Sequence, residues 1–224
     1  MLTLVNSKII AHTLARALAC AHSLPSSPIA SVTPMKIRTI ATTLLTLITA
    51  AALSGCGTVS TIGKLEDGAG AEASRMWDRW IEGGGDIAVA TTWERKVKPG
   101  VTGDDIEQIL RSVATERNMK EVGILPLSKE LAARTGTPQK LLTVYSFCTP
   151  TTAREMVDFS PHMAAYLPCR ITVVEKEDGL WLYTLNMDMM VKMGRKLPSP
   201  LKEHAWAVRS TIYEMMERAS KGEF

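Results

Sequence analysis

The chain has 224 residues, of which 46% are hydrophobic and 22% charged, and its formal net charge at pH 7 is +3. The positive balance lies at the beginning, because residues 1–55 contain no acidic residue and four basic ones, Lys8, Arg16, Lys36 and Arg38. Without these four, 22 of the 26 basic residues remain against 23 acidic ones, a net charge of −1. The remainder lacks the basic excess of nucleic-acid-binding proteins, so we expect no nucleic-acid partner.

The start of the chain has the pattern of a secretory signal. The basic residues 35–38, MKIR, precede TIATTLLTLITAAAL at 39–53, an uncharged apolar run too short to span a bilayer as a helix. LSGC at 53–56 then resembles the bacterial lipobox, whose cysteine is lipidated and becomes the first residue. We therefore expect residues 35–55 to be a lipoprotein signal peptide and Cys56 to carry acyl chains such as palmitate.

This interpretation predicts a location and a start codon. The mature protein would lie in the bacterial cell envelope, lipid-anchored and facing the periplasm, with the membrane as a partner. Met35 is then a better start than Met1, and residues 1–34 are interpreted as an upstream extension from a start codon placed too early. Peptides from residues 1–34 in cells would contradict this interpretation.

Residues 56–86 are expected to form a tether and a short helix. Small and polar residues at 57–71 predict a flexible linker. EASRMWDRWIE at 72–82 predicts a helix with one apolar face, formed by Met76, Trp77, Trp80 and Ile81. We expect this face to dock on the folded domain, with contact to the membrane as the alternative.

The folded domain is expected at 87–224. Alternation predicts a strand at 87–97, a short strand is expected at 121–127, and β-forming residues predict another at 140–148. Residues 102–118 form the clearest helical pattern, opened by a capping box of Thr102 and Asp105. A helical turn is expected at 128–136, ending at Gly136.

The second half of the domain continues with helical signals at 151–158 and 163–166. A hairpin follows at 170–186, turning at Asp178-Gly179. Ser199 and Pro200 are expected as N-cap and first residue of a final helix. This order predicts an α+β fold of two layers, with a mostly antiparallel sheet, helices packed on one face and a C-terminal helix.

The stretch FCTPTTAREMVDFSPHMAAYLPCRITVVEKEDGLWLYT at 147–184 resembles the core of the bacterial domain of unknown function 302 family. The matching features are Phe147-x-Thr149-Pro150, Met156, Leu167-Pro168-x-Arg170 and Asp178-Gly179, with Thr149 where the family usually has Asn. The resemblance covers about residues 85–195, and the final helix lies beyond it. It implies a small α+β fold, often in envelope or sulfur-oxidation contexts, and no established reaction.

Cys148 and Cys169 are the other two cysteines of the predicted mature chain. A disulfide between them, worth ~3 kcal/mol in the chain-entropy model, would suit an oxidising periplasm. It requires that the strands before and after the intervening segment run antiparallel, because a parallel arrangement would place the thiols too far apart. Free buried thiols and a reactive or metal-binding pair are the alternatives.

A soft metal site is a further possibility. Cys148, Cys169, His162 and Met163 together would suit copper(I), although their spacing matches no zinc pattern. Met187, Met189, Met190 and Met193 add thioethers, but at helical spacing they divide between two faces and are expected to fill the core. A single histidine such as His162 is most often a hydrogen-bonded loop residue. We therefore expect no resident cofactor, with copper as the alternative.

The same segment carries charges that would suit an anion or a small polar ligand. His162, Arg170 and Arg154 are the candidate ligand-binding residues, with Glu155 and Asp158 beside them. The alternative is a solvated helix face with Arg154 paired to Asp158. Sequence motifs for nucleotide binding, serine hydrolases, zinc proteases and covalent haem are absent.

The leading hypothesis is a lipid-anchored envelope protein whose domain binds a small molecule or an envelope protein at residues 148–170. We do not expect an enzyme. The alternative is a periplasmic redox or copper-handling protein that uses Cys148, Cys169 and His162. A third possibility is a structural interaction protein that uses Trp77, Trp80 and the final helix.

Overall fold

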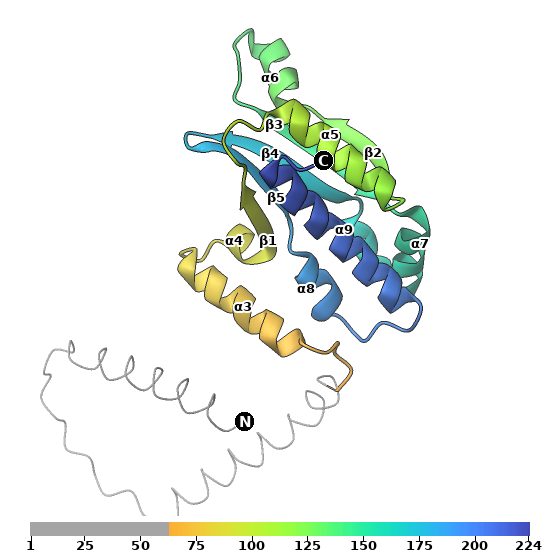
Figure 1. The fold of residues 1–224 in the computed structure, drawn as a ribbon. Coiled ribbons are helices and arrows are strands. Elements are labelled where there is room, and N and C mark those ends of the chain that lie inside the picture. The colour runs from red at the N-terminus through yellow and green to blue at the C-terminus, as the bar shows by residue number, and fades with distance from the viewer. Residues whose placement is uncertain (1–62) are drawn as a thin grey trace, which may run out of the picture. The chain divides into compact units, whose positions relative to one another are not determined.

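The computed structural model describes residues 63–224. The predicted upstream extension (1–34), signal peptide (35–55) and lipidated Cys56 lie outside the described residues. Within them, the order of the elements beyond residue 92 is the predicted one apart from one additional short helix, α8, and the fold is α+β (Figure 1). The helices are α3 (Ala69–Glu82), α4 (Ile87–Thr91), α5 (Gly103–Glu116), α6 (Leu127–Thr135), α7 (Pro150–Phe159), the 3₁₀ helix η2 (Pro161–Tyr166), α8 (Met187–Lys192) and α9 (Leu201–Lys221).

Five strands form one antiparallel sheet in the order β1-β5-β4-β3-β2. They are β1 (Thr92–Lys96), β2 (Lys120–Leu125), β3 (Leu142–Cys148), β4 (Cys169–Lys176) and β5 (Gly179–Leu185). The predicted hairpin forms β4 and β5, which pair up to Lys176 and Gly179. The prediction of a mostly antiparallel sheet is thus confirmed.

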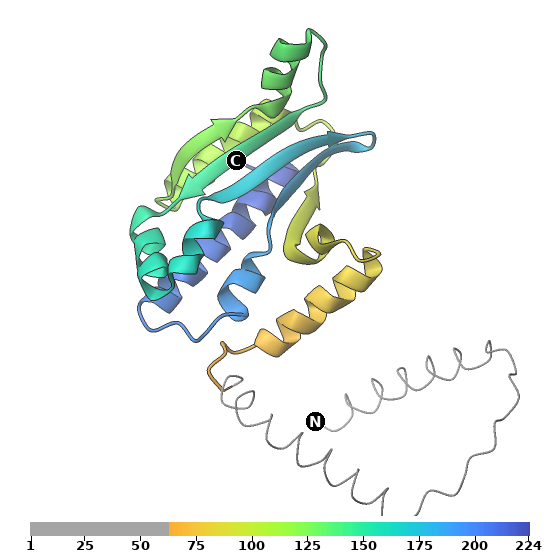
Figure 2. The ribbon, with the colours of Figure 1, turned by 180° about the vertical axis from the view of Figure 1, so that it is seen from behind.

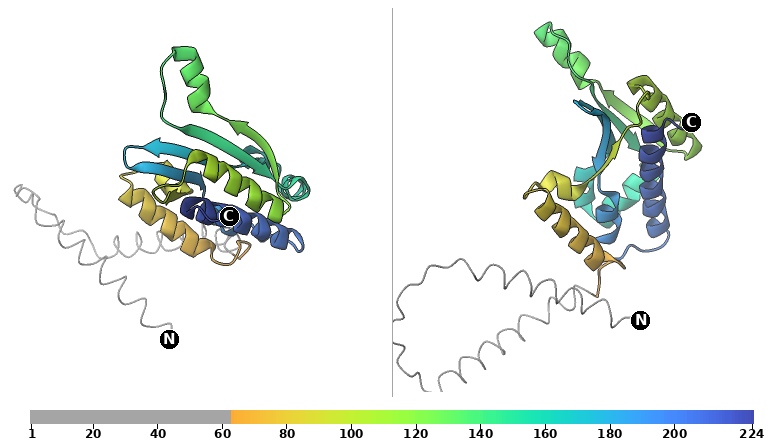
Figure 3. Two further views of the ribbon diagram at one scale, coloured as in Figure 1. Left: turned by 45° about the horizontal axis from the view of Figure 1, so that its top comes forward. Right: turned by 60° about the vertical axis from the view of Figure 1, so that its left-hand side comes forward.

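Helices α5 and α9 pack against one face of the sheet, as the edge-on view shows (Figure 3, right). Alternate strand residues such as Phe147, Ile171 and Leu182 meet Ile109 and Ile212 of these helices in a fully buried core. Each such side chain contributes ~1.5–3 kcal/mol by leaving water. This layer is the stable frame from which the connecting segments β3–α7–η2–β4 and β5–α8–α9 extend.

The capping box predicted for α5 is confirmed. Asp105 N donates to Thr102 Oγ1 over 3.1 Å, and Thr102 N donates to Asp105 Oδ2 over 2.8 Å. The predicted start of α9 is wrong by one residue, because Pro200 is the N-cap and Leu201 the first helical residue. The Ser199 hydroxyl donates instead to the side chain of Glu203.

The strand predicted at 87–97 begins only at Thr92. Residues 87–91 form the short helix α4, because the Asp86 side chain accepts a hydrogen bond from Ala88 N (2.8 Å) and caps it. The run IAVAT suits a strand and a helix equally well by its own pattern. The local capping bond therefore decides its structure.

Helix α3 docks on the domain, but through only part of its predicted apolar face. Its buried residues are Ala69 and Glu72, and the Glu72 carboxylate accepts a hydrogen bond from Asn186 Nδ2 at the start of α8 (2.8 Å). Trp77 and Ile81 stay 61% and 57% exposed. The predicted docking is confirmed, but the docking surface is only partly the predicted one: Met76 and Trp80 are half-buried, and the buried polar contact of Glu72 turns Trp77 and Ile81 toward solvent.

Candidate functional site

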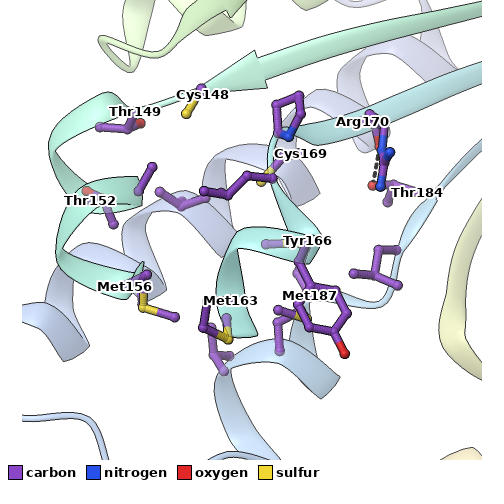
Figure 4. A pocket seen from close by; sticks show the side chains of 18 of the residues that line it. Cys148, Thr149, Thr152, Met156, Met163, Tyr166, Cys169, Arg170, Thr184 and Met187 are labelled. Atoms are coloured by element: carbon purple, nitrogen blue, oxygen red, sulfur yellow. Dashed lines mark hydrogen bonds between the residues drawn. The ribbon is translucent and has the colours of Figure 1, made fainter. Parts of the chain in front are cut away.

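A cavity of about 360 Å³ lies where α7, η2, α8 and the N-terminal half of α9 meet the ends of β3, β4 and β5 (Figure 4). Seen from behind, α7 and η2 lie beside these strand ends with α9 beyond them (Figure 2). The volume falls within the usual range of small-molecule sites. Residues 148–170, the segment expected to bind a ligand, thus form much of one wall.

Sulfur-bearing side chains are prominent in this wall. Thioethers and thiols from five elements of the fold converge there, namely Met156, Met163, Met187, Met190, Cys148 and Cys169. The two methionine groups lie about 30 residues apart in the chain, and the fold of α7, η2 and α8 brings them together. Methionine adapts its shape readily, so this wall suits an apolar molecule of irregular outline.

The polar part of the lining is small. Hydroxyl groups come from Thr149, Thr152, Tyr166 and Tyr183, among others. Among the lining residues that the structure describes, Arg170 is the only one with a charged side chain and none is acidic. A mostly apolar cavity with a few polar groups is the usual composition of a ligand site.

The cavity also reaches the sheet face opposite the core. Val144 pairs with Thr172, and Thr172 pairs with Tyr183, so these three side chains form one cross-strand row. The next row, Tyr145, Ile171 and Thr184, faces the core. Both faces of these central strands therefore carry packed side chains.

Cys148 and Cys169 come close together because β3 and β4 are antiparallel, the arrangement that the predicted disulfide requires. However, Phe147 lies directly opposite Cys169, so these two side chains share the core face and Cys148 points to the other face. Both thiols are free in the described part of the chain. The register favours the alternative of two free thiols, and the disulfide stays a prediction.

The surroundings of both thiols oppose ionisation. Burial raises the pKa of Cys169 to about 11, and the neighbouring Cys148 adds to the effect. Burial also raises the pKa of Cys148. Because the thiolate is the nucleophile and metal ligand, both groups are poorly reactive at neutral pH without a partner that displaces the proton.

Of the three predicted ligand-binding residues, the cavity includes only Arg170. Arg154 is exposed on α7 and pairs with Asp158, as the alternative predicted, with Arg154 Nε 2.9 Å from Asp158 Oδ2. Glu155 contacts His204 of α9, with Glu155 Oε2 2.7 Å from His204 Nδ1. His162 is exposed on η2 and is not among the described residues that line the cavity.

The metal candidates are only partly brought together. Cys148, Cys169 and Met163 line the cavity and His162 does not. Within residues 63–224, no three His, Cys, Asp or Glu side chains are grouped closely enough to hold a metal ion. Met189 and Met193 also lie outside the lining, so a site here would depend on thioethers and the two thiols.

Some lining residues carry no functional signal in the sequence. The pattern predicts only strands at Val144, Thr172 and Tyr183, and only helical segments at Thr152 and Tyr166. One signal was available: β3 and β4 carry β-branched or apolar residues at both alternate positions, which indicates strands packed on both faces.

In residues 63–224 we find no helix that combines the length and apolarity needed to cross a bilayer. This finding concerns the described part of the chain alone.

Two similar proteins are both described as uncharacterized. An uncharacterized protein of Aquifex aeolicus (strain VF5) is 26% identical over 102 residues, or 45% of this chain. The chain spans 65% of that relative's length. The crystal structure of an uncharacterized conserved DUF302 protein from Bacillus stearothermophilus aligns with 58% of this chain and 98% of its own, at 15% identity and a TM-score of 0.46.

The family profile described as "Domain of unknown function DUF302" matches residues 93–219, which is more than half of the chain. The match includes α9 up to Ala219, so the expectation that the final helix lies beyond the family domain is wrong. The physical reason is that Ile212, Met215 and Met216 of α9 complete the core. This chain belongs to the family called domain of unknown function DUF302.

Proposed function

We propose that this protein is a lipid-anchored envelope protein whose DUF302 domain binds a small, mostly apolar molecule between η2, α7, α8 and the sheet. The observation that carries the proposal is the cavity of about 360 Å³ with its sulfur-rich, largely apolar wall. Each CH₂ group that a ligand buries there would contribute ~0.8 kcal/mol. The protonated thiols and the absence of acidic side chains from the described lining fit binding better than catalysis.

The envelope location rests on the signal pattern at 35–56 and gains support from the surface that follows the tether. Trp77 and Ile81 of α3 and Ile87 of α4, which is 65% exposed, form uncharged apolar surface on adjoining helices. Tryptophan is typical of the membrane–water boundary. In a protein anchored at Cys56, α3 would begin 13 residues after the lipid and Trp77 would lie 21 residues after it, so this surface could lie against the bilayer.

Filling the cavity tests the ligand proposal. Ala153 lines the cavity from α7, and Ala153→Trp would occupy it, whereas Ala207 is exposed on α9 and Ala207→Trp serves as the matched control. The probe is N-phenyl-1-naphthylamine, a neutral fluorophore that brightens in apolar sites. We expect Ala153→Trp to weaken binding by at least tenfold and Ala207→Trp to leave it unchanged. Equal binding by both variants would refute the cavity as the site.

The anchor is tested separately. Cells grown with labelled palmitate should incorporate the label into the native protein, which should sediment with membranes. Cys56→Ser should abolish both results. Label that persists in this variant, or a native protein found in the soluble fraction, would overturn the location without affecting the cavity.

A second candidate function is copper(I) handling, favoured by the six sulfur-bearing residues in one wall. Thioethers and thiols are the preferred ligands of copper(I). Because the thiols are protonated at neutral pH, binding through them would release protons and strengthen as the pH rises. Competition of the purified protein against a coloured copper(I) chelator at pH 6 and pH 8 tests this; affinity unaffected by replacing Met156 and Met163 with Leu would exclude it.

A further inference from the structure

Arg170 differs from most arginines of the described domain in its electrostatic surroundings. Arg154, Arg209 and Arg218, for example, each pair with a carboxylate. Arg170 forms no ion pair with any residue from 63 to 224, although it lies at the boundary of a cavity. Because the described lining includes no acidic side chain, the cavity supplies a positive charge without its own counter-charge.

The register places this charge at a defined side of the cavity. Arg170 lies opposite Ser146 and two residues before Thr172, on the sheet face whose Thr172 and Tyr183 line the cavity. The backbone there is fixed, because the Thr184 hydroxyl donates a hydrogen bond to the Arg170 carbonyl over 2.6 Å. Figure 4 shows Arg170 and Thr184 at the opposite side of the cavity from Thr152 and Met156.

The two sides therefore differ in chemistry. The side at α7 and η2 offers apolar contact through Met156 and Met163, while the side at β4 offers the arginine. Tyr166, at the end of η2, adds a polar group and is 44% exposed. A purely apolar ligand would leave the arginine unused, and a small polar anion would leave the methionine wall unused. A molecule with an anionic head and an apolar body would satisfy both.

We propose that the ligand is an amphipathic anion, with a carboxylate, sulfonate or phosphate group at Arg170 and an apolar body against the methionine wall. This inference rests on the proposed ligand binding in the cavity and names the ligand class. A guanidinium is well suited to the head group, because it binds such oxyanions through two parallel hydrogen bonds. Since Arg170 is exposed, the head would remain partly hydrated and the preference for an anion moderate.

Two probes that differ by one sulfonate group test the class. N-phenyl-1-naphthylamine is neutral, and 1-anilinonaphthalene-8-sulfonate adds the anionic group to the same aromatic body. Both are titrated into the full-length Cys56→Ser chain, and only the fluorescence that Ala153→Trp removes is counted as binding in the cavity. We expect the sulfonate to bind on the order of tenfold more tightly at low salt and to lose part of this advantage at high salt.

Variants then assign the preference to one residue. Arg170→Gln should remove the preference for the sulfonate without changing the affinity for the neutral probe, and Arg170→Lys should retain part of it. Arg154→Gln, which removes a paired arginine outside the lining, is the matched control and should leave the preference intact. The affinity for the neutral probe also verifies that each variant is folded.

The possible outcomes distinguish a failure of the anionic ligand class from a failure of the proposed ligand binding in the cavity. If neither probe gives a signal that Ala153→Trp removes, the proposed cavity binding fails. If the neutral probe binds there and the sulfonate binds no better, or if Arg170→Gln keeps the preference, cavity binding stands and the anionic class is overturned.

Discussion

The two halves of α9 serve different surroundings. In the C-terminal half, Ile212, Met215 and Met216 are fully buried between α5 and the sheet. In the N-terminal half, Ala205 and Val208 border the cavity. One continuous helix thus packs into the core along its C-terminal half and lines the cavity along its N-terminal half. The residues that stabilise the fold and those that border the proposed binding site therefore lie in different parts of the same helix.

The largest expected effect contrasts the two halves directly. Ile212→Ala should lower the free energy of unfolding by about 2–5 kcal/mol, because it leaves a hole in a fully buried core. Val208→Ala, beside an existing cavity, should cost about 1 kcal/mol, because it only enlarges that space. Urea denaturation measures both. Equal losses would contradict the distinction between the halves.

The next effect is the pH dependence of stability at Cys169, which shares the core face and also lines the cavity. Burial raises the pKa of Cys169 from about 9 to about 11, so the folded state favours the protonated thiol. Its stabilising contribution is complete below pH 9 and is lost as the pH rises to 11, a decline of up to about 2–3 kcal/mol. Denaturation midpoints between pH 8 and 11 measure it. Cys169→Ala should show a shallower decline, and an unchanged slope would disprove this assignment.

A smaller effect is expected where α3 meets α8. Asn186 donates to Glu72 over 2.8 Å and accepts hydrogen bonds from Asp188 N and Met189 N at the start of α8. Asn186→Ala removes the helix cap and one partner of a buried carboxylate, so we expect a loss of about 1–3 kcal/mol. Thermal unfolding detects it. Asn186→Asp, which keeps the cap but repels Glu72, should recover only part of the loss.

The smallest expected effect lies on the exposed face of α7. Arg154→Gln breaks the pair with Asp158, which is fully solvated, so the denaturation midpoint should stay within experimental error. The same substitution should leave probe binding unchanged. A clear loss of stability would show that the outer face of α7 contributes more to the domain than its exposure indicates.

The sequence predicted most elements wherever the signal was local. The capping box of Thr102 and the β-forming residues of β3 are local signals, and both predictions are confirmed. The hairpin is confirmed too, but its turn lies one residue before the predicted Asp178-Gly179, because Lys176 pairs with Gly179. At 87–91 the local sequence fits both a strand and a helix, and the side-chain cap from Asp86 selects the helix. Local chemistry was therefore enough for the frame of the fold.

The candidate site could be predicted only in part. The sequence identified Arg170, Met163 and the cysteines, yet the cavity also needs Met156 and Met187 in one lining, and the chain separates these two by 31 positions. The orientation of the thiols depends on the pairing of Phe147 with Cys169, and a shift of one residue would reverse it. Non-local pairing of this kind has no signature in a single sequence.

The staggered positions of Cys148 and Cys169 provide two chemical reporters on opposite faces of the same sheet. A thiol reagent would modify Cys148 when the segments around the cavity open locally, and Cys169 more slowly, because Cys169 lines the cavity but also packs against the core. Comparing the two modification rates would show which part of the domain opens first, without any engineered label.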